Sequence, residues 1–381
     1  MNRGHAGRVR TAEIPVRVVA ERGVRRKKGL AAWLSVAMGV LIVAKIASAQ
    51  QPVHEEVSVE RVEVTLHVTD RRGEPIRGLA ASDFRVFVDK RAVSIESLEW
   101  VSSGPRVDST AAESGTKREG VGGAESSAPQ AAPGRLIVLL FQWEIAGQKQ
   151  EGFLRMMRQA LDFVDSLEPH DRLAVLTLGA RLWLRQDFTE DRGKARSAIR
   201  SALAQQQGEG SAGEGQISLA AGLGSGTQRD ATTIEKALLA IGRALKPIPG
   251  SKSVLFLGWG IGKWRATFEN DPQLSAVVYS KDFELARVAL SEAQAPVFTL
   301  DISGGWHQLE EGLKRLSFET GGSYVPTYLF PEWAMKTIAH SISGHYVLVF
   351  RKPDGPKGSH AIRIESPRRE AVLLYRQGFE D

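Results

Sequence analysis

The chain of 381 residues contains no cysteine. This absence excludes disulfide bonds, thiol nucleophiles, cysteine-ligated zinc and a lipid anchor attached to cysteine, although it does not by itself fix the cellular compartment. The hydrophobic content of 42% and the charged content of 25% are ordinary for a globular protein. The length allows two or three domains.

The apolar run at residues 30–44 is shorter than the roughly 20 residues that a membrane-spanning helix needs. It follows the basic segment 25–28 and precedes Ala47-Ser48-Ala49. This order of basic segment, short apolar core and small residues predicts a secretory signal peptide over residues 1–49. We therefore expect export to the periplasm, the cell surface or the medium. The alternative is an uncleaved segment that tethers the protein to a membrane.

The chain also lacks a charge excess of its own once this segment is set aside. Residues 1–49 hold ten of the 50 Lys and Arg residues and two of the 44 acids, which leaves 40 basic and 42 acidic residues. The remainder therefore carries a net charge of −2, against +6 for the whole chain. Nucleic acid, which basic surfaces bind, is not an expected partner.

Common catalytic and nucleotide-binding motifs are missing as well. Residues 258–263 (GWGIGK) fail the spacing of a phosphate-binding loop, and Trp264 stands where Ser or Thr would bind Mg²⁺. No serine lies in a Gly-x-Ser-x-Gly motif. The histidines show no metal-ligand spacing, and we expect a structural role for His345 and His360. The sequence predicts a protein without catalytic activity.

Alternating apolar residues over 57–70, and short strand patterns at 84–88 and 93–100, predict a small β-module at residues 50–101. Residues 102–134 are rich in Ser, Gly, Ala, Pro and Glu and predict a disordered linker. The alternative is a long surface loop within one domain.

Buried strands and amphipathic helices alternate over residues 135–328, which predicts a doubly wound, mainly parallel sheet. Strands are expected at 136–141, 173–178, 182–186, 254–258 and 297–301, and helices at 150–167, 192–204, 232–245, 281–293 and 308–320. Residues 329–381 predict a helix and strands at 346–351, 360–365 and 371–375. Because small sheets are not stable alone, we expect these strands to pair with the N-terminal ones, so that the α/β domain is inserted into a β-sandwich-like module.

Several motifs resemble those of von Willebrand factor A (vWA) domains, in the secreted subfamily abundant in acidobacteria. The resembling segments within the α/β domain are Asp171-Arg172-Leu173-Ala174-Val175 and Thr320-Gly321-Gly322-Ser323-Tyr324. Those that resemble the flanking β-modules are 64–70, Gly78-Leu79, Asp83-Phe84, 346–348, 360–362 and 376–379. The resemblance implies an adhesion or protein-interaction module rather than an enzyme.

The resemblance also implies a Mg²⁺ site built from an Asp-x-Ser-x-Ser loop, a Thr and a second Asp. In this chain Gln142, Glu144 and Ala146 stand at the three loop positions, and Gly258 stands at the second Asp. Only Glu144 and a threonine, either Thr232 or Thr233, could still be metal ligands. Such a donor set is poor for a cation that prefers several charged oxygens. We therefore expect no cofactor, and binding that is independent of metal.

Four tryptophans follow strands of the predicted sheet: Trp143, Trp259, Trp264 and Trp306. Together with Gln142 and Glu144 they form a candidate binding surface for a protein or glycan at the cell envelope, because Trp contributes strongly to recognition. The interpretation that we favour is that the rings fill the space that a metal ion and its loops occupy elsewhere, because indole rings are highly buried on average.

The sequence thus predicts an exported, non-catalytic interaction protein. One alternative is a structural envelope component that packs against other subunits. Another is a hydrolase that uses Asp301 and Glu144, which requires a raised pKa in one of them. For Asp301 we favour a simpler role, in which its side chain accepts a hydrogen bond from the following turn. The sequence does not predict the oligomeric state.

Overall fold

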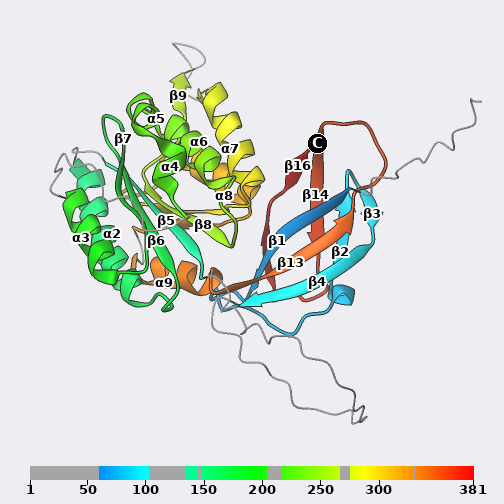
Figure 1. The fold of residues 1–381 in the computed structure, drawn as a ribbon. Coiled ribbons are helices and arrows are strands. Elements are labelled where there is room, and N and C mark those ends of the chain that lie inside the picture. The colour runs from blue at the N-terminus through cyan, green and yellow to red at the C-terminus, as the bar shows by residue number, and fades with distance from the viewer. Residues whose placement is uncertain (1–59, 103–133, 144–146, 204–216, 267–274, 329–330) are drawn as a thin grey trace, which may run out of the picture. The chain divides into compact units, whose positions relative to one another are not determined.

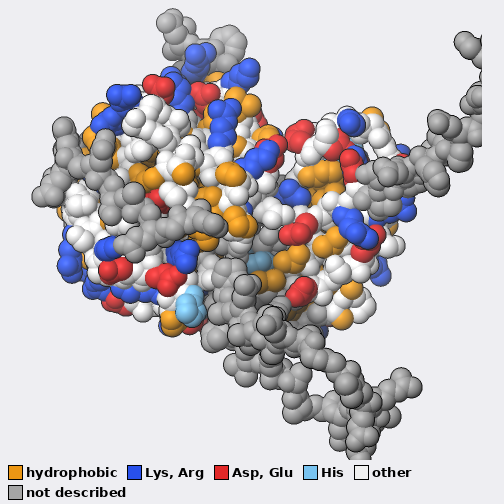
Figure 2. Space-filling view, viewed as in Figure 1, with side chains coloured by type: hydrophobic (Ala, Val, Ile, Leu, Met, Phe, Trp, Pro, Cys, Tyr) orange, Lys and Arg blue, Asp and Glu red, His pale blue; other side chains and the backbone are white. Residues whose placement is uncertain are grey.

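The computed structural model describes residues 60–102, 134–143, 147–203, 217–266, 275–328 and 331–381 (Figure 1). Figure 2 shows the same view with side chains coloured by type, and basic and acidic side chains are interspersed over the face that it shows. The predicted signal peptide, and the predicted linker apart from its two end residues, lie outside these ranges. None of the helices in the described ranges combines the length and the apolar composition needed to cross a membrane.

A six-stranded sheet forms the centre of the α/β domain. In spatial order its strands are β12 (Tyr324–Pro326), β11 (Val297–Asp301), β8 (Lys252–Gly258), β5 (Leu136–Gln142), β6 (Arg172–Leu178) and β7 (Leu182–Thr189). Neighbouring strands are parallel except for β6 and β7. The 179–181 connection between that pair is too short for a crossover, so β7 must run antiparallel. The chain starts at β5, winds outward to β7 and returns to β8, which makes the β5–β8 border the switch point of the sheet.

The central strand β5 is buried on both faces, which explains its unbroken apolar sequence. Leu136, Val138 and Leu140 belong to one core. Side chains alternate along a strand, so Ile137, Leu139 and Phe141 enter the other core.

Helices cover both faces of the sheet (Figure 1). The face with Ile137 is covered by α2 (Gly147–Asp165), α3 (Arg192–Leu203) and α9 (Pro331–Ser341). The opposite face is covered by α4 (Leu219–Leu223), α6 (Ile234–Leu245), α7 (Lys281–Glu292) and α8 (Glu310–Thr320). The short α5 (Ser225–Asp230) precedes α6, and a separate two-stranded hairpin consists of β9 (Lys263–Ala266) and β10 (Ser275–Val278).

Strands from the two ends of the chain form a β-sandwich. One sheet has the order β15 (Val372–Tyr375), β1 (Arg61–Thr69), β13 (Gly344–Arg351) and β4 (Ile95–Ser102). The other has the order β16 (Gly378–Glu380), β14 (Ser359–Glu365), β2 (Arg85–Val88) and β3 (Arg91–Val93), and a 3₁₀ helix, η1 (Ala81–Asp83), precedes β2. The predicted fold class is therefore confirmed, including the pairing of N-terminal with C-terminal strands.

Tyr346 of β13 is the largest fully buried side chain of this sandwich, and it connects β13 to residues 76–79. Its hydroxyl accepts a hydrogen bond from Leu79 N at 3.0 Å and donates one to Ile76 O at 3.1 Å. Its ring meets Trp100 edge-on at 4.8 Å. The buried hydroxyl is thus paired, as burial of a polar group requires.

The Thr-Gly-Gly motif after α8 has a specific packing reason at each residue. Thr320 Oγ1 accepts a hydrogen bond from Val297 N at 3.1 Å and donates one to Leu316 O at 2.8 Å. Gly321 ends the helix at a φ of 90°, in the left-handed region that favours glycine. A Cβ on Gly322 would lie 2.0 Å from Val297 O, so only glycine lets the backbones approach this closely.

We expect Gly322→Ala to destabilise the protein by about 2 kcal/mol, because strand β11 would have to move away from the added methyl group. Gly305→Ala is the matched control, since a Cβ there meets no atom within 4 Å. Urea unfolding of the two variants measures the difference. Equal stability would contradict the close packing at Gly322.

Two buried histidines, His67 of β1 and His345 of β13, pack together with ring centroids 5.4 Å apart. His67 Nδ1 lies 2.9 Å from Ser341 O at the end of α9, and its ring meets Phe298 of β11 edge-on. Burial lowers the pKa of His67 to about 4 and that of His345 to about 3, the latter with a smaller contribution from His67. The expected structural role of His345 agrees with this packing.

These shifts predict acid lability. The unfolded chain takes up protons on both histidines below a pH of about 6.5, whereas the folded protein does so only below about 4. The free energy of unfolding should therefore fall as the pH decreases through this window, by about 2 kcal/mol per histidine at pH 4.5. Urea unfolding at pH 7 and 4.5 should show a smaller loss for His345→Asn than for the parent. His170→Asn, at an exposed site, should keep the full loss.

Candidate functional site

The candidate site lies where β5, β8 and β11 end. The parallel register pairs Asp301 with Gly258 and Phe141 with Leu257, so the carboxyl ends of the three strands are neighbours. The sequence predicted this juxtaposition. Ligands of open α/β sheets bind at this edge, near the switch point.

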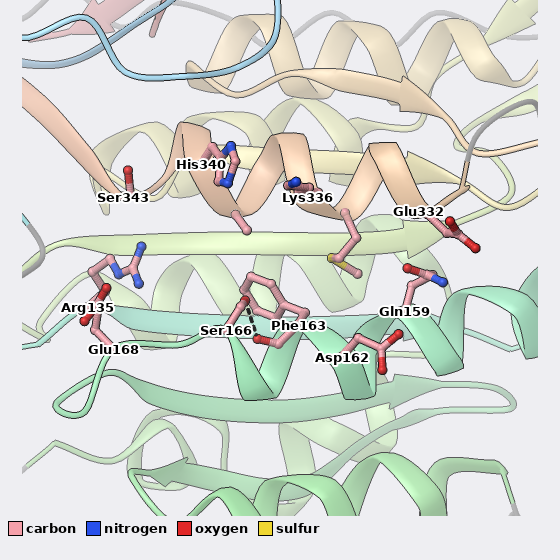
Figure 3. A pocket seen from close by; sticks show the side chains of 12 residues that line it. Arg135, Gln159, Asp162, Phe163, Ser166, Glu168, Glu332, Lys336, His340 and Ser343 are labelled. Atoms are coloured by element: carbon pink, nitrogen blue, oxygen red, sulfur yellow. Dashed lines mark hydrogen bonds between the residues drawn. The ribbon is translucent and has the colours of Figure 1, made fainter.

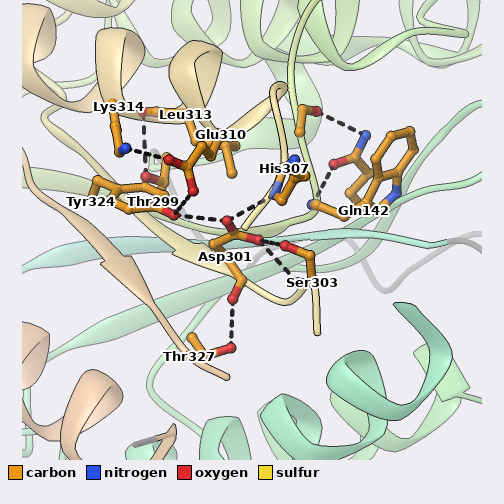
Figure 4. Close-up of polar contacts among 12 residues, drawn as sticks. Gln142, Thr299, Asp301, Ser303, His307, Glu310, Leu313, Lys314, Tyr324 and Thr327 are labelled. Atoms are coloured by element: carbon orange, nitrogen blue, oxygen red, sulfur yellow. Dashed lines mark hydrogen bonds and ion pairs between the residues drawn. The ribbon is translucent and has the colours of Figure 1, made fainter. Parts of the chain in front are cut away.

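Gln142 ends β5 with its side chain buried (Figure 4). Its Oε1 accepts a hydrogen bond from Trp259 N at 3.0 Å, and its Nε2 donates one to Gly260 O at 3.4 Å. A carboxylate could accept the first bond but could not donate the second. The amide of Gln142 therefore fits this site, where its two hydrogen bonds hold the loop after β8 against the end of β5.

Gly258 has no room for a side chain. A Cβ there would lie 2.2 Å from the Phe256 ring and 2.8 Å from Gln142 Oε1. The two positions at which the vWA resemblance places aspartates thus offer no carboxylate, and the donor set at these positions does not fit a Mg²⁺ ion.

The other predicted ligands are placed only in part. Glu144 and Ala146 lie outside the described residues. Thr232 and Thr233 are exposed, and Thr233 Oγ1 accepts a hydrogen bond from Lys236 N, which caps α6. Within the described ranges, no group of three or more His, Asp or Glu side chains is arranged to hold a metal ion.

Asp301 ends β11 and is fully buried, with both carboxylate oxygens engaged. Oδ1 accepts hydrogen bonds from the backbone N of Ser303 at 3.0 Å and from Ser303 Oγ. Oδ2 accepts a bond from Tyr324 OH at 2.8 Å and lies 3.0 Å from His307 Nε2. The expected hydrogen bond to the following turn is confirmed.

The network continues onto α8 and β12 (Figure 4). Tyr324 OH also lies 3.3 Å from Glu310 Oε2, and Lys314 Nζ donates to Glu310 Oε1 at 2.5 Å. Burial and the carboxylates of Asp301 and Glu310 raise the pKa of Tyr324, which keeps the hydroxyl a proton donor. No recognisable motif along the chain predicted these members of the network as site residues: His307, Glu310, Lys314 and Tyr324.

The hydrogen bonds of this network favour the ionised form of Asp301. Burial alone would raise the pKa of Asp301, but hydrogen bonds from His307 and Ser303 outweigh burial and lower the pKa. A hydrolase that uses Asp301 as its acid would need the opposite shift. Ser303 Oγ donates its hydrogen bond to Asp301 Oδ1, and no histidine hydrogen-bonds to Ser303 among the described residues.

The four tryptophans divide into two pairs. Trp143 and Trp259 are partly buried and pack on the core beneath α2, where Trp143 meets Phe153 edge-on at 4.4 Å. Trp264 on β9 is 47% exposed, and Trp306 in the loop after β11 is 73% exposed. The structure therefore brings the first pair into the core and leaves the second pair accessible to a partner.

The Gly-rich loop 258–263 does not form a phosphate site. It leads into strand β9 instead of a helix, so the helix N-terminus that holds phosphate is missing. Gly262 N donates to Glu235 Oε1 at 3.3 Å, which places a carboxylate where an anion would have to bind.

The order of the strands, the antiparallel edge strand β7 and the helices on both faces give the α/β domain a vWA-like fold. This confirms the fold that the sequence resemblance implied; the acidobacterial subfamily stays a prediction.

Comparison with solved structures finds similar vWA-containing chains, all at low identity. One is the conserved hypothetical protein BatB from Bacteroides thetaiotaomicron, with 15% identity, a TM-score of 0.36, and coverage of 55% of this chain and 98% of that chain. Another is a von Willebrand factor type A protein from Catenulispora acidiphila, with 11% identity, a TM-score of 0.37, and coverage of 84% and 74%. A third is proximal thread matrix protein 1 from the mussel byssus, with 14% identity, a TM-score of 0.34, and coverage of 56% and 47%. No protein-family model and no curated protein sequence matches the chain.

We expect Asp301→Asn to destabilise the protein by about 2 kcal/mol, because it weakens charge-assisted hydrogen bonds from Ser303, His307 and Tyr324. Asp354→Asn, at an exposed turn, should change the stability by less than about 0.5 kcal/mol. Thermal and urea unfolding measure both. An unchanged Asp301→Asn protein would show that the network contributes nothing to stability.

Proposed function

We propose that the protein is an exported, non-catalytic interaction module that binds a protein or glycan partner at the cell envelope without a metal ion. The observation that carries the proposal is the amide of Gln142. Gln142 stands at the position where the vWA resemblance implies the first metal ligand. Both polar atoms of its side chain form hydrogen bonds with the loop after β8.

Two further observations support the proposal. Gly258 cannot carry the second acidic ligand, since any side chain there would overlap Phe256. Asp301, a buried carboxylate at the end of β11, has both oxygens engaged in hydrogen bonds. Neither residue leaves a free anionic oxygen for a cation.

The exposed pair Trp264 and Trp306 is the proposed contact surface. Large apolar rings that remain accessible beside a polar edge are typical of recognition sites, where they bury much area at little entropic cost. Export rests on the predicted signal peptide, which would bring this surface to the envelope.

The test is capture of envelope components, and binding to a glycan array, by the immobilised protein with and without EDTA. We expect capture to be insensitive to EDTA and to drop at least about tenfold for Trp264→Ala/Trp306→Ala, since exposed aromatic contacts often dominate an interface. Phe318→Ala is the matched control, because that ring is 46% exposed on α8. All three proteins should melt alike, because the substitutions remove exposed rings.

Millimolar Mg²⁺ or Mn²⁺ should leave the melting temperature unchanged. A ligand at 100 times its dissociation constant would add about 2.7 kcal/mol of stability. Capture that EDTA abolishes, or a metal-dependent rise in melting temperature, would overturn the metal-independent proposal. Capture that survives loss of both tryptophans would move the binding surface elsewhere and favour a packing role.

A further inference from the structure

A groove of about 540 Å³ lies between α2 and α9, away from the tryptophan pair (Figure 3). This volume lies within the range of ligand-binding pockets. Phe163 of α2 and Met335 of α9 supply its apolar lining, and each is only 3% exposed. We call these two side chains the apolar floor of the groove.

The charged side chains along the groove are unevenly paired. Arg135 is engaged by the buried Asp171, and His340 lies 2.6 Å from Glu74. The acids Asp162, Glu168 and Glu332 are exposed, and none of them has a side-chain hydrogen bond or ion pair among the described residues. Asp162 does interact electrostatically with Arg196 of α3, at a longer distance than an ion pair. Lys336 is the only cation of the lining that lacks such a partner there. The unpaired charge of the described groove is therefore negative.

The acids also have a definite place. Glu332 of α9 and Asp162 of α2 lie across from each other at one end of the groove, next to Gln159, while Arg135 and Glu168 lie at the other end (Figure 3). Two carboxylates from opposite walls can share one guanidinium or ammonium group between them. The apolar floor begins directly beside this acidic end.

The length of the groove fits a short extended segment. Its lining on α9 runs from Glu332 to His340, which is about 12 Å at a rise of 1.5 Å per helical residue. An extended peptide advances about 3.3 Å per residue, so about four residues span this distance. Lys336 stands between the ends, where its ammonium can donate to peptide carbonyl oxygens.

We propose that this groove binds an extended segment of a partner protein that carries a Lys or Arg next to an apolar side chain. The basic group lies between Asp162 and Glu332, and the apolar side chain lies on Phe163 and Met335. This is a second binding surface, and it does not depend on the function proposed for Trp264 and Trp306.

The experiment selects binders to the full chain from random dodecapeptides displayed on phage, then measures synthetic versions by fluorescence anisotropy. We expect the selected peptides to share a Lys or Arg within about three positions of an aliphatic or aromatic residue, the reach of the groove. Asp162→Asn/Glu332→Gln should raise the dissociation constant at least about tenfold, because two charge-assisted contacts are lost. Both sites are exposed, so the variant should fold.

Two matched variants isolate the groove. Asp354→Asn/Glu370→Gln removes two exposed acids elsewhere and should leave the affinity unchanged. Trp264→Ala/Trp306→Ala should also leave it unchanged, which separates this test from that of the proposed function. Failure to enrich any basic sequence, or equal affinity of the groove variant and the parent, would overturn the proposal. Concentration-dependent self-association that displaces the peptides would assign the groove to a second copy of the chain instead.

Discussion

The buried ion pair between Arg135 and Asp171 is the contact on which the arrangement of the α/β domain depends. Arg135 Nε donates to Asp171 Oδ1 at 2.9 Å, a second guanidinium nitrogen binds Oδ2, and Nη1 donates to Ile342 O at 3.0 Å. Asp171 also accepts a hydrogen bond from Glu168 N at 2.8 Å. One guanidinium thus joins the start of β5, the entry to β6 and the end of α9. Removing one member of a buried pair costs about 3–5 kcal/mol, so these points of the chain are held together firmly.

This pair lies where the chain enters the α/β domain and where it returns to the sandwich. Helix α9 ends at Ser341, and β13 begins three residues later at Gly344. Because the carbonyl of Ile342 is bound by Arg135 and that of Ser341 by His67, the return point is fixed from both sides. The same anchoring sets the position of α9 beside α2, and hence the width of the groove between them.

Much of this architecture could be predicted from the sequence, because it rests on local patterns. Unbroken apolar runs such as residues 136–141 give buried parallel strands, and the alternation in Arg61–Thr69 gives a half-buried one. The position of Gln142 at the end of the central strand followed from the same pattern. Its partner could not be predicted, since the bonds to Trp259 and Gly260 join residues more than 100 positions apart.

The hydrogen-bond network of the candidate site could not be predicted from the sequence either. The residues of the network meet because β11 ends, α8 begins and the edge strand β12 begins at one place; they are Asp301, His307, Glu310 and Tyr324. Their spacing along the chain has no period, and each residue type alone is common at surfaces. Likewise, sequence pattern placed all four tryptophans at one sheet edge, but only packing decides that Trp143 is partly buried while Trp306 is 73% exposed.

The two edges of the central sheet satisfy their buried polar groups in different ways. At the amino edge a charged pair is neutralised internally, by Arg135 and Asp171. At the carboxyl edge a neutral amide and a fully hydrogen-bonded carboxylate, Gln142 and Asp301, leave no anionic oxygen free for a ligand. The hydrogen bonds of Gln142 and Asp301 hold the loops after β8 and β11 in fixed positions at this edge. Our two proposals therefore assign recognition to exposed side chains, namely Trp264 and Trp306 beyond this edge and the acids of the groove between α2 and α9.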